Sequence, residues 1–274
     1  MWLVGLGLAS SGCSSDGSDG QQANSGGNAG TGGSNTSAGS GGKGANSSGS
    51  GGGTPTGNAD TFGDPHEGQY HLGPVDFAET EWHNACAPGG GYRDVLRGST
   101  GLSGEFIAGV SNEFADGGGV CDACILIETA TGRSIVARVV TYGVEQEAGD
   151  IDVSPSVFEA LSTDEYPRTM TWHYARCPET TSLQYEFQTE ANIYWTSLWV
   201  RNPRVPIDIV EVKSQSDADF VELARGTDGT LTDAGGFGDG PFTLRITAID
   251  GQVLTDDLPG FSPGELVTSP LQFE

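Results

Sequence analysis

The stretch CDACILIETATGRSIVARVVTYG, residues 121–143, contains two runs rich in Val and Ile that are separated by the segment TATGR. A short break with glycine between two such runs predicts a β-hairpin. Further short β segments lie on either side of it, SGEFIAGVS at 103–111 and TMTWHYARC at 169–177. We therefore expect a compact β-barrel or sandwich in this part of the chain.

The single helix candidate in this part is SPSVFEALS, residues 154–162. Ser154 suits the N-cap, and Pro155 suits the first helical position because its missing N–H would be unpaired there in any residue. Three apolar residues share one face of this helix: Val157, Phe158 and Leu161. We expect one short helix that packs on the β structure.

The segment GDIDV, residues 149–153, precedes this helix. In an extended conformation Ile151 and Val153 face one side. Asp150 and Asp152 then face the other side, about 7 Å apart. Paired carboxylates suit general acid chemistry, because each negative charge raises the pKa of its neighbour. The alternative is a pair of solvated aspartates that interact with the dipole of the following helix.

Residues 1–13, MWLVGLGLASSGC, form a short apolar run that ends in small residues and Cys13. Residues 14–57 are almost entirely Gly, Ser, Asn, Ala and Thr, a composition that buries too little apolar surface to fold. We expect an exported protein on a disordered tether, with a lipid on Cys13. A plain secretory signal and a start-site artefact are the alternatives, because no Lys or Arg precedes the apolar run.

The formal net charge of the 274 residues is -25. Such a surface repels nucleic acid and anionic membranes, so neither is an expected partner. Beyond the N-terminal segment no stretch approaches the roughly 20 apolar residues that a membrane span requires. A neutral polymer or a small molecule is the natural partner, and solubility alone is the alternative explanation of the acidity.

Apart from Cys13, the chain has four cysteines: Cys86, Cys121, Cys124 and Cys177. Four such residues in an exported protein favour two disulfides, although the CDAC pair and two distant cysteines also permit a zinc site. Three histidines add possible ligands but fit no tight metal motif: His66, His71 and His83. We expect disulfides, no metal and no cofactor.

From about residue 181 onward, strand-like runs recur at short intervals, among them SLQYEFQT, IDIVEVKS and FTLRITAID. Regular spacing, turns with Gly, Asp and Pro, and the absence of helical periodicity predict a β-sandwich.

One strand of this sandwich, residues 194–201, is rich in aromatic residues. Alternation places Leu198 and Val200 on the core side, together with Tyr194. Trp195 and Trp199 share the opposite side, about 13 Å apart. Exposed rings of this kind stack well on the apolar faces of sugars. The alternative for each tryptophan is burial in the core.

The segments CDACILIETATGRSIVARVV, GDIDVSPSVFEALS, TMTWHYARCP, NIYWTSLWVRNPRVPIDIVEV and PFTLRITAIDGQVLTDDLP follow one another in this order. Together they resemble the microbial expansins, over residues 58–274. The resemblance implies an all-β fold, with a six-stranded double-psi β-barrel over 58–180 and an immunoglobulin-like, carbohydrate-binding β-sandwich over 181–274. It also implies that Cys86 pairs with Cys121 and that Cys124 pairs with Cys177.

The resemblance further assigns residues to a polysaccharide groove on the barrel. Asp152 and Ser154 match the family's groove segment, and Tyr70 stands where a threonine usually lines the groove. In RVVTYGV, where family members carry an aspartate needed for wall loosening, this chain has Thr141 beside Tyr142.

The threonine decides what chemistry is expected. An inverting glycosidase needs an acid and a base about 6.5 to 9.5 Å apart, and Thr141 supplies neither at neutral pH. We therefore expect no hydrolysis by this arrangement. We hypothesise that Asp150, which has no counterpart in the family's motif, compensates from the neighbouring strand.

Tyr194 and Trp195 match the consecutive aromatics of the family's cellulose platform. Pure alternation faces them in opposite directions, so the exposure of both requires a bulge or twist at the start of the strand. The third aromatic of the platform has no counterpart, because GTDGTLTDAGGFGDG occupies its region. We expect a weaker affinity for cellulose than is usual in the family, with Trp199 lengthening the platform.

These features predict a secreted or cell-surface bacterial lipoprotein that binds and loosens cellulose or a related β-glucan without hydrolysing it. We expect a monomer whose partner is a neutral polysaccharide and which touches a membrane only through a lipid on Cys13. Two alternatives stay open. One is an endoglucanase or peptidoglycan-lytic enzyme on the same barrel, and the other is a surface carbohydrate-binding protein with an inactive groove.

Overall fold

The computed structural model describes residues 60–73, 85–86, 106–143, 147–178, 181–260 and 263–274. Gly52–Glu274 form one compact unit. No helix in the described part of the chain is long and apolar enough to cross a membrane. The predicted signal segment with Cys13, the tract 14–57 and His83 lie outside the described residues.

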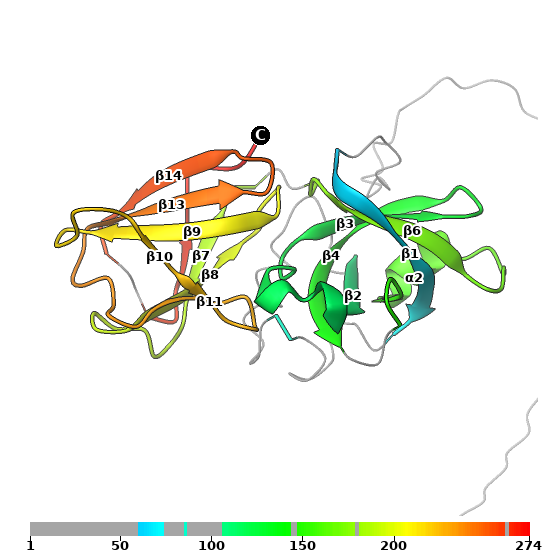
Figure 1. Ribbon diagram of the computed structural model, residues 1–274, viewed down its shortest axis with the longest axis horizontal. Helices are drawn as coiled ribbons and strands as arrows, with labels where there is room; N and C mark the ends of the chain where they lie inside the picture. Colours follow the sequence, from blue (N-terminus) through cyan, green and yellow to red (C-terminus); the bar gives the residue numbers. More distant parts are fainter. Residues whose placement is uncertain (1–59, 74–84, 87–105, 144–146, 179–180, 261–262) are drawn as a thin grey trace, which may run out of the picture. The chain divides into compact units, whose positions relative to one another are not determined.

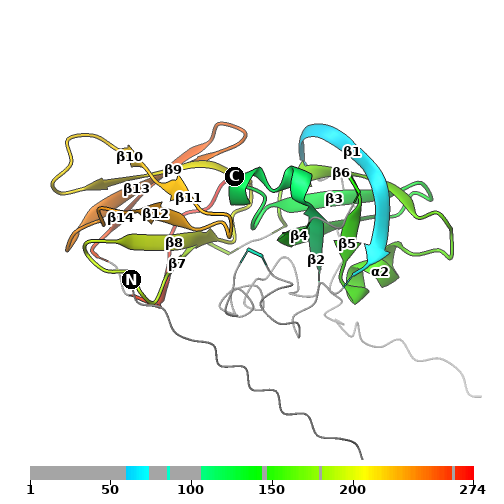
Figure 2. The same cartoon turned by 60° about the horizontal axis from the view of Figure 1, so that its bottom comes forward.

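Six strands of the first half close into a barrel in the order β1, β5, β2, β4, β3, β6 (Figure 1; β5 is labelled in Figure 2). Their bounds are β1 Thr61–Leu72, β2 Ile107–Ser111, β3 Cys124–Thr129, β4 Ser134–Gly143, β5 Ile151–Val153 and β6 Thr169–Ala175. The pairs β1·β5 and β2·β4 are parallel, and the other neighbours are antiparallel. The predicted hairpin is β3·β4, and its turn contains Gly132, whose positive φ of 84° suits glycine.

Alternate residues of the barrel strands form its core. The buried cluster includes Tyr70, Ala108, Ile125, Ile127, Val139, Ile151, Val153, Met170 and Trp172. Full burial of one such side chain stabilises the fold by roughly 1.5–3 kcal/mol, so a slip of one residue in any strand is costly. The core therefore fixes which residues of each strand face outward.

In the described part of the barrel half, one helix and two short turns accompany the strands. The helix α2, Pro155–Leu161, begins directly after Ser154, as predicted, and buries Val157 and Leu161 in the barrel core. Two 3-10 turns follow β2, η2 at Asn112–Phe114 and η3 at Asp116–Gly118.

The second half is a sandwich of two sheets (Figure 2). One sheet has the order β10, β9, β13, β14, and the other has the order β11, β12, β8, β7, β15. The bounds are β7 Gln184–Phe187, β8 Thr196–Arg201, β9 Ile207–Ser214, β10 Val221–Glu222, β11 Ala224–Arg225, β12 Leu231–Asp233, β13 Phe242–Ala248, β14 Val253–Leu258 and β15 Leu266–Thr268. Their inward residues, such as Phe187, Leu198 and Leu244, form one core. The predicted class, a six-stranded barrel followed by a β-sandwich, is confirmed.

Two disulfides join Cys86 to Cys121 and Cys124 to Cys177. This is the pairing that the resemblance implied. Each of the four sulfur atoms belongs to one of these two disulfides, so none of them is free to hold zinc. The bridged residues are 35 and 53 positions apart in the sequence, and each bridge stabilises the fold mainly by restricting the unfolded chain.

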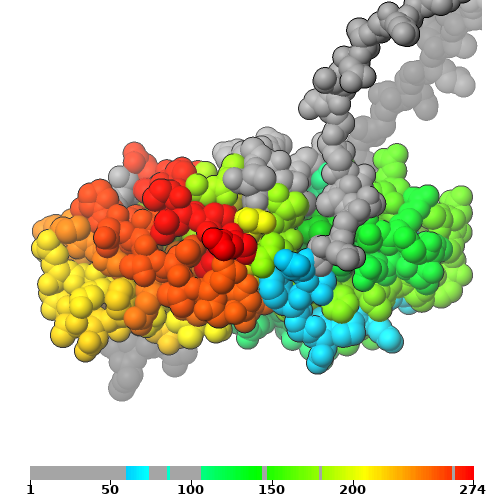
Figure 3. Space-filling model, turned by 90° about the horizontal axis from the view of Figure 1, so that it is seen from above, coloured from blue at the N-terminus to red at the C-terminus, as the bar shows by residue number. Residues whose placement is uncertain are grey.

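The barrel and the sandwich touch directly. Phe62, at the start of β1, packs against the sandwich core. In Figure 3 the cyan start of β1 lies against the orange and red atoms of the sandwich. Beside it, the guanidinium of Arg176 lies 3.1 Å from Asp60 Oδ2 and 3.9 Å from Asp250 Oδ2.

Candidate functional site

Strand register builds a row of residues on the outer face of the barrel. Thr141 on β4 lies opposite Gly109 on β2, and Gly109 lies opposite Asp152 on β5. Asp152 in turn lies opposite His71 on β1. Adjacent strands are about 4.8 Å apart, so Thr141 and Asp152 are separated by about 10 Å, with only a glycine between them. The row therefore combines an acid and an imidazole on a wall that has no side chain at its middle position.

Asp150 lies beside this row and is held firmly. Its Oδ1 accepts the backbone N–H of Gln69 (2.7 Å), and its Oδ2 lies 3.1 Å from His71 Nε2. The two backbone segments approach closely at Gly68, since a Cβ on this residue would lie 2.3 Å from the carbonyl oxygen of Gly149. The Asp150 side chain is 13% exposed and that of His71 is 45% exposed, so the pair reaches solvent.

Asp152 owes its position to a neighbouring glycine. A Cβ on Gly73 would lie 2.4 Å from Asp152 Cβ and 2.7 Å from its Cγ. Ile151 and Val153 on either side are fully buried, whereas Asp150 and Asp152 are only partly buried. This is the alternation predicted for GDIDV, with both carboxylates on the outer face.

Two residues expected to line the groove are buried, so these predictions are wrong. Tyr70 is 0% exposed because it faces the barrel core, between the outward Gln69 and His71. Its hydroxyl donates to Glu165 Oε1 (2.9 Å), and burial together with this bond raises the pKa of Tyr70 to about 12. Ser154 is 2% exposed, and its Oγ accepts the backbone N–H of Ile107 (3.5 Å) instead of capping α2.

Thr141 and Tyr142, also expected in the groove, lie where other segments cover β4. Thr141 is 9% exposed, and its Oγ1 accepts the backbone N–H of Ala85 (3.2 Å), so the prediction that it lines an open groove is wrong. Tyr142 is half-buried against the barrel core, and its hydroxyl donates to the carbonyl oxygen of Thr227 in the sandwich. The residues that reach solvent here are therefore Asp152 and His71 of the row and Asp150 beside it, and we call these three residues the acidic row.

In the sandwich, a tight turn presents two aromatic rings. Tyr194 is 76% exposed and Trp195 is partly exposed. The turn closes through two backbone bonds between Asn192 and Trp195, of 2.7 and 3.1 Å. Asn192 Oδ1 also accepts the backbone N–H of Tyr194 (2.9 Å). A hydrogen-bonded turn at residues 192–195, and not a bulge within the strand, thus leaves both rings accessible.

The loop after β12 packs against the backbone of this turn. Gly236 has a φ of +73°, and a Cβ there would lie 2.4 Å from the carbonyl oxygen of Ile193 and 2.6 Å from the nitrogen of Trp195. Gly238 N–H donates to the same Ile193 oxygen (3.1 Å). Neither this glycine contact nor the role of Asn192 was predicted. The Asn two residues before Tyr194 and the Gly-Gly pair in AGGFG are the local signals for them.

The prediction that Trp199 lengthens the aromatic surface is wrong. Its side chain faces away from Leu198 and Val200, as alternation predicts, but Trp199 is only 8% exposed. The indole N–H donates to the carbonyl oxygen of Asp228 (3.0 Å), and the Arg201 guanidinium lies 4.7 Å from the ring centroid. Arg201 and the loop at Asp228, both of the sandwich, therefore cover Trp199 on this face of β8.

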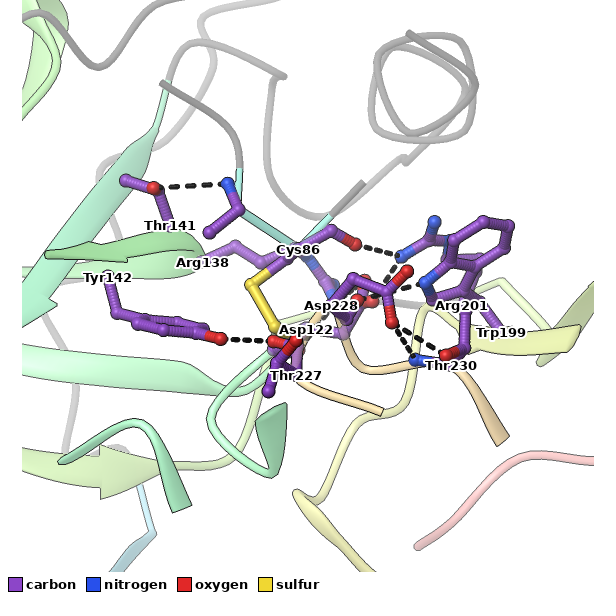
Figure 4. The surroundings of a disulfide bond; sticks show 12 residues. Cys86, Asp122, Arg138, Thr141, Tyr142, Trp199, Arg201, Thr227, Asp228 and Thr230 are labelled. Carbon is purple, nitrogen blue, oxygen red and sulfur yellow. Dashed lines mark hydrogen bonds and ion pairs between the residues drawn. A yellow bond between two sulfur atoms is a disulfide. The ribbon is translucent and has the colours of Figure 1, made fainter. Parts of the chain in front are cut away.

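Arg201 joins the two folds through buried ion pairs (Figure 4). It is 0% exposed and lies 2.7 Å from Asp122 Oδ2 in the barrel and 2.7 Å from Glu186 Oε2 in the sandwich. Arg138 approaches the other oxygen of Asp122 at 3.7 Å. The Arg201 guanidinium also donates to the carbonyl oxygen of Cys86 (3.4 Å), whose disulfide appears in the same view. Asp122, between two cysteines in CDAC, was not predicted to have a role.

Comparison with known proteins places this geometry in context. No protein-family model matches the chain. It is 22% identical to expansin-like protein 3 of Dictyostelium discoideum over 205 residues, and 20% identical to expansin-like protein 6 over 189 residues. These alignments cover 73% and 66% of this chain, and they span 61% and 65% of the length of the two curated relatives.

Two solved structures have the same fold. Both are expansins of Clavibacter michiganensis, one an apo form and the other an Asp-to-Asn mutant in complex with cellohexaose. Each matches with a TM-score of 0.64 at 18% identity and covers 77% of this chain and 98% of the solved chain. The chain is therefore expansin-like, in its fold and in its resemblance to expansin-like proteins.

Proposed function

We propose that the protein binds a neutral β-glucan, such as cellulose, through Tyr194 and Trp195, and that its barrel loosens the glycan without hydrolysing it. The observation that carries this proposal is the pair of accessible rings on a turn held by hydrogen bonds. A backbone turn that is already ordered loses little backbone entropy on binding, so more of the stacking energy appears as affinity.

The charge of the protein supports an uncharged ligand. A formal net charge of -25 disfavours acidic polysaccharides, whereas stacking on the apolar faces of sugar rings needs no positive charge. The related expansin that was solved with cellohexaose has a neutral glucan as its ligand.

The barrel face supports binding without hydrolysis. Asp150, Asp152 and His71 offer acceptors and one ring nitrogen to sugar hydroxyls. The residue that lies across Gly109 from Asp152 is Thr141, which cannot act as a second acid or base. An endoglucanase or lytic role of the same barrel is therefore not favoured.

Retention on crystalline cellulose tests the binding role. Trp195→Ala removes the larger ring and should weaken retention about tenfold, and Tyr194→Ala should weaken it less. Tyr166→Ala is the matched control, because Tyr166 is 85% exposed but belongs to the barrel. Unchanged retention of both Trp195→Ala and Tyr194→Ala would remove the platform from the proposal.

Two assays distinguish the three possible roles of the barrel: loosening, hydrolysis or lysis, and binding alone. Mechanical weakening of cellulose paper without release of reducing sugar or muropeptides is expected. Release of either product would show a hydrolytic or lytic enzyme. Retention on cellulose with no weakening of paper would show a surface binding protein with an inactive groove.

We also propose that the protein is an exported monomer anchored by a lipid on Cys13. Two disulfides are typical of proteins that fold outside the cytoplasm, which supports export. Cys13→Ala should release the protein from membranes in a cell fractionation, and light scattering on the purified protein should give the mass of one chain.

A further inference from the structure

A concave site lies on the barrel, on the outer face of β1, β6 and β3. The hollow has a volume of about 660 Å³, within the range of small-molecule sites. It is lined by Glu67, Gly68, Gln69, Glu128, Thr129, Ala130, Asp150, Thr169, Met170 and Thr171. It is separate from the aromatic turn, and it shares only Asp150 with the acidic row.

Strand register explains the arrangement of its polar side chains. Glu67 on β1 and Glu128 on β3 both lie opposite Thr171 on β6, so the two acids flank this threonine, about 10 Å apart. Two residues further along the same strands, Gln69 lies opposite Thr169. Hydroxyl, amide and carboxylate groups thus line the same concave face.

The hollow carries negative charge without a compensating cation among its lining residues. Glu67 and Glu128 are exposed, and Asp150 is the third carboxylate. The nearest basic residues along the chain are engaged elsewhere: Arg133 donates to the Ala160 and Ser162 carbonyl oxygens, and Arg168 stacks 4.9 Å from the Phe158 ring.

Two histidines of the described residues lie near the hollow without lining it: His71 lies against Asp150 Oδ2, and His173 lies two residues beyond Thr171 on β6. The His71 contact involves the Asp150 carboxylate, whereas Glu67 and Glu128 face the hollow. A cleft lined by one sign of charge raises the local concentration of ligands of the opposite sign.

A metal ion does not match this arrangement. The described residues contain no group of three or more His, Cys, Asp or Glu side chains that could hold a metal. Calcium needs its oxygen ligands at 2.3–2.6 Å, whereas Glu67 and Glu128 stand on strands about 10 Å apart. A larger ligand with many hydroxyl groups and a positive charge uses both the threonines and the separated acids.

We propose that this hollow binds a β-1,4-linked sugar that carries a free, protonated amino group, as in a deacetylated chitin. The ammonium group lies against Glu67 or Glu128, and the ring hydroxyls bond to Thr169, Thr171 and Gln69. The site is independent of the aromatic turn, so this proposal stands or falls separately from cellulose binding.

Calorimetry on the full chain with two tetramers of the same linkage tests the proposal. The glucosamine tetramer and cellotetraose differ in the C2 substituent, and the former should bind about tenfold more tightly at low salt. Most of this difference should disappear at about 0.5 M salt, because exposed charges are then screened.

Paired variants locate the site. Glu67→Gln with Glu128→Gln should bring the affinity for the glucosamine tetramer to within about twofold of that for cellotetraose. Glu159→Gln with Glu222→Gln removes the same charge from exposed positions elsewhere and should keep the preference. NMR shifts of the Thr169 and Thr171 amides should follow the glucosamine titration.

Three results would overturn the proposal. The first is equal affinity for both tetramers, and the second is a preference that survives Glu67→Gln with Glu128→Gln. The third is an equal loss in both double variants, which would mean that the overall charge alone attracts the amine. Retention on cellulose is measured in parallel, and its loss in Trp195→Ala reports on the aromatic turn and not on the hollow.

Discussion

The aromatic turn at residues 192–195 and the acidic row on the barrel are built in different ways. The turn is neutral, and short-range hydrogen bonds and a glycine contact hold the backbone that carries its two rings. The row is charged, and the pairing of strands far apart in the sequence brings Asp150, Asp152 and His71 together. Because the two regions are built separately, a substitution in the turn can change the affinity for a glycan without changing the loosening activity of the barrel. A substitution in the acidic row can likewise change the loosening activity without changing the affinity.

The largest effect is expected at Arg201, where the barrel that carries the acidic row and the sandwich that carries the turn are joined. Arg201→Met should lower the free energy of unfolding by about 3–5 kcal/mol, because it removes the cation closest to the buried Asp122 carboxylate. Chemical denaturation measures the change.

Arg245→Met is the matched control. Its ion pair with Glu211 lies at the surface, with the arginine side chain 38% exposed, so a loss of at most about 1 kcal/mol is expected. Equal losses in the two variants would show that the junction contributes no more than a surface ion pair.

The sharpest division between the regions is expected from Asp150→Asn with Asp152→Asn. This double variant should reduce the weakening of cellulose paper at least tenfold, since it removes both outward carboxylates of the row. Its retention on cellulose should stay as in the unaltered protein. Full weakening activity in the double variant would contradict a role for the two aspartates.

Gly236→Ala tests the support of the aromatic turn. The new Cβ would press on Ile193 and Trp195, so the turn must shift, and retention on cellulose should fall severalfold. Gly251→Ala carries the same backbone strain, with φ +85°, but meets nothing within 4 Å. Equal retention of the two variants would mean that the geometry of the turn does not matter for binding.

The smallest effect concerns His66, whose ring centroid lies 4.2 Å from that of Trp172 in the barrel. Burial, and then the charge of His173, lower the pKa of His66, while Asp64 and Glu113 act in the opposite direction. The unfolded chain therefore takes up this proton first, and the stability present above pH 6.5 is lost progressively as the pH falls below it.

His66→Phe keeps an aromatic ring on Trp172 but does not titrate. Thermal melting between pH 7.5 and 5 should show a shallower decrease for this variant than for the unaltered protein. An identical decrease in both proteins would contradict the assignment of this part of the acid sensitivity to His66.

The sequence predicted well what depends on local periodicity. The β3·β4 hairpin and the outward aspartates of GDIDV follow from alternation, and the helix after Ser154 follows from Pro155 at its first position and from its apolar face. The disulfide pairing and the order of barrel and sandwich followed from the resemblance to expansins, because spacing does not determine which cysteines meet.

The predictions that failed concern residues whose burial depends on a distant segment. Trp199 has the alternation of an exposed residue, but Arg201 and the loop at Asp228 cover it. Thr141 faces outward and is covered by the segment at Ala85. Ser154, which the resemblance assigned to the groove, is buried against Ile107 of β2. Tyr70 failed for a different reason, because its position on β1 faces the barrel core.

The central claim, that the sandwich turn contacts the glycan, is tested most directly by NMR of the tryptophan indole N–H groups. During a titration with cellohexaose, the Trp195 signal, assigned with a Trp195→Phe variant, should shift in a saturable way. The buried indoles of Trp172 and Trp199 should stay in place. A Trp195 signal that remains still while the protein binds cellohexaose would contradict the account.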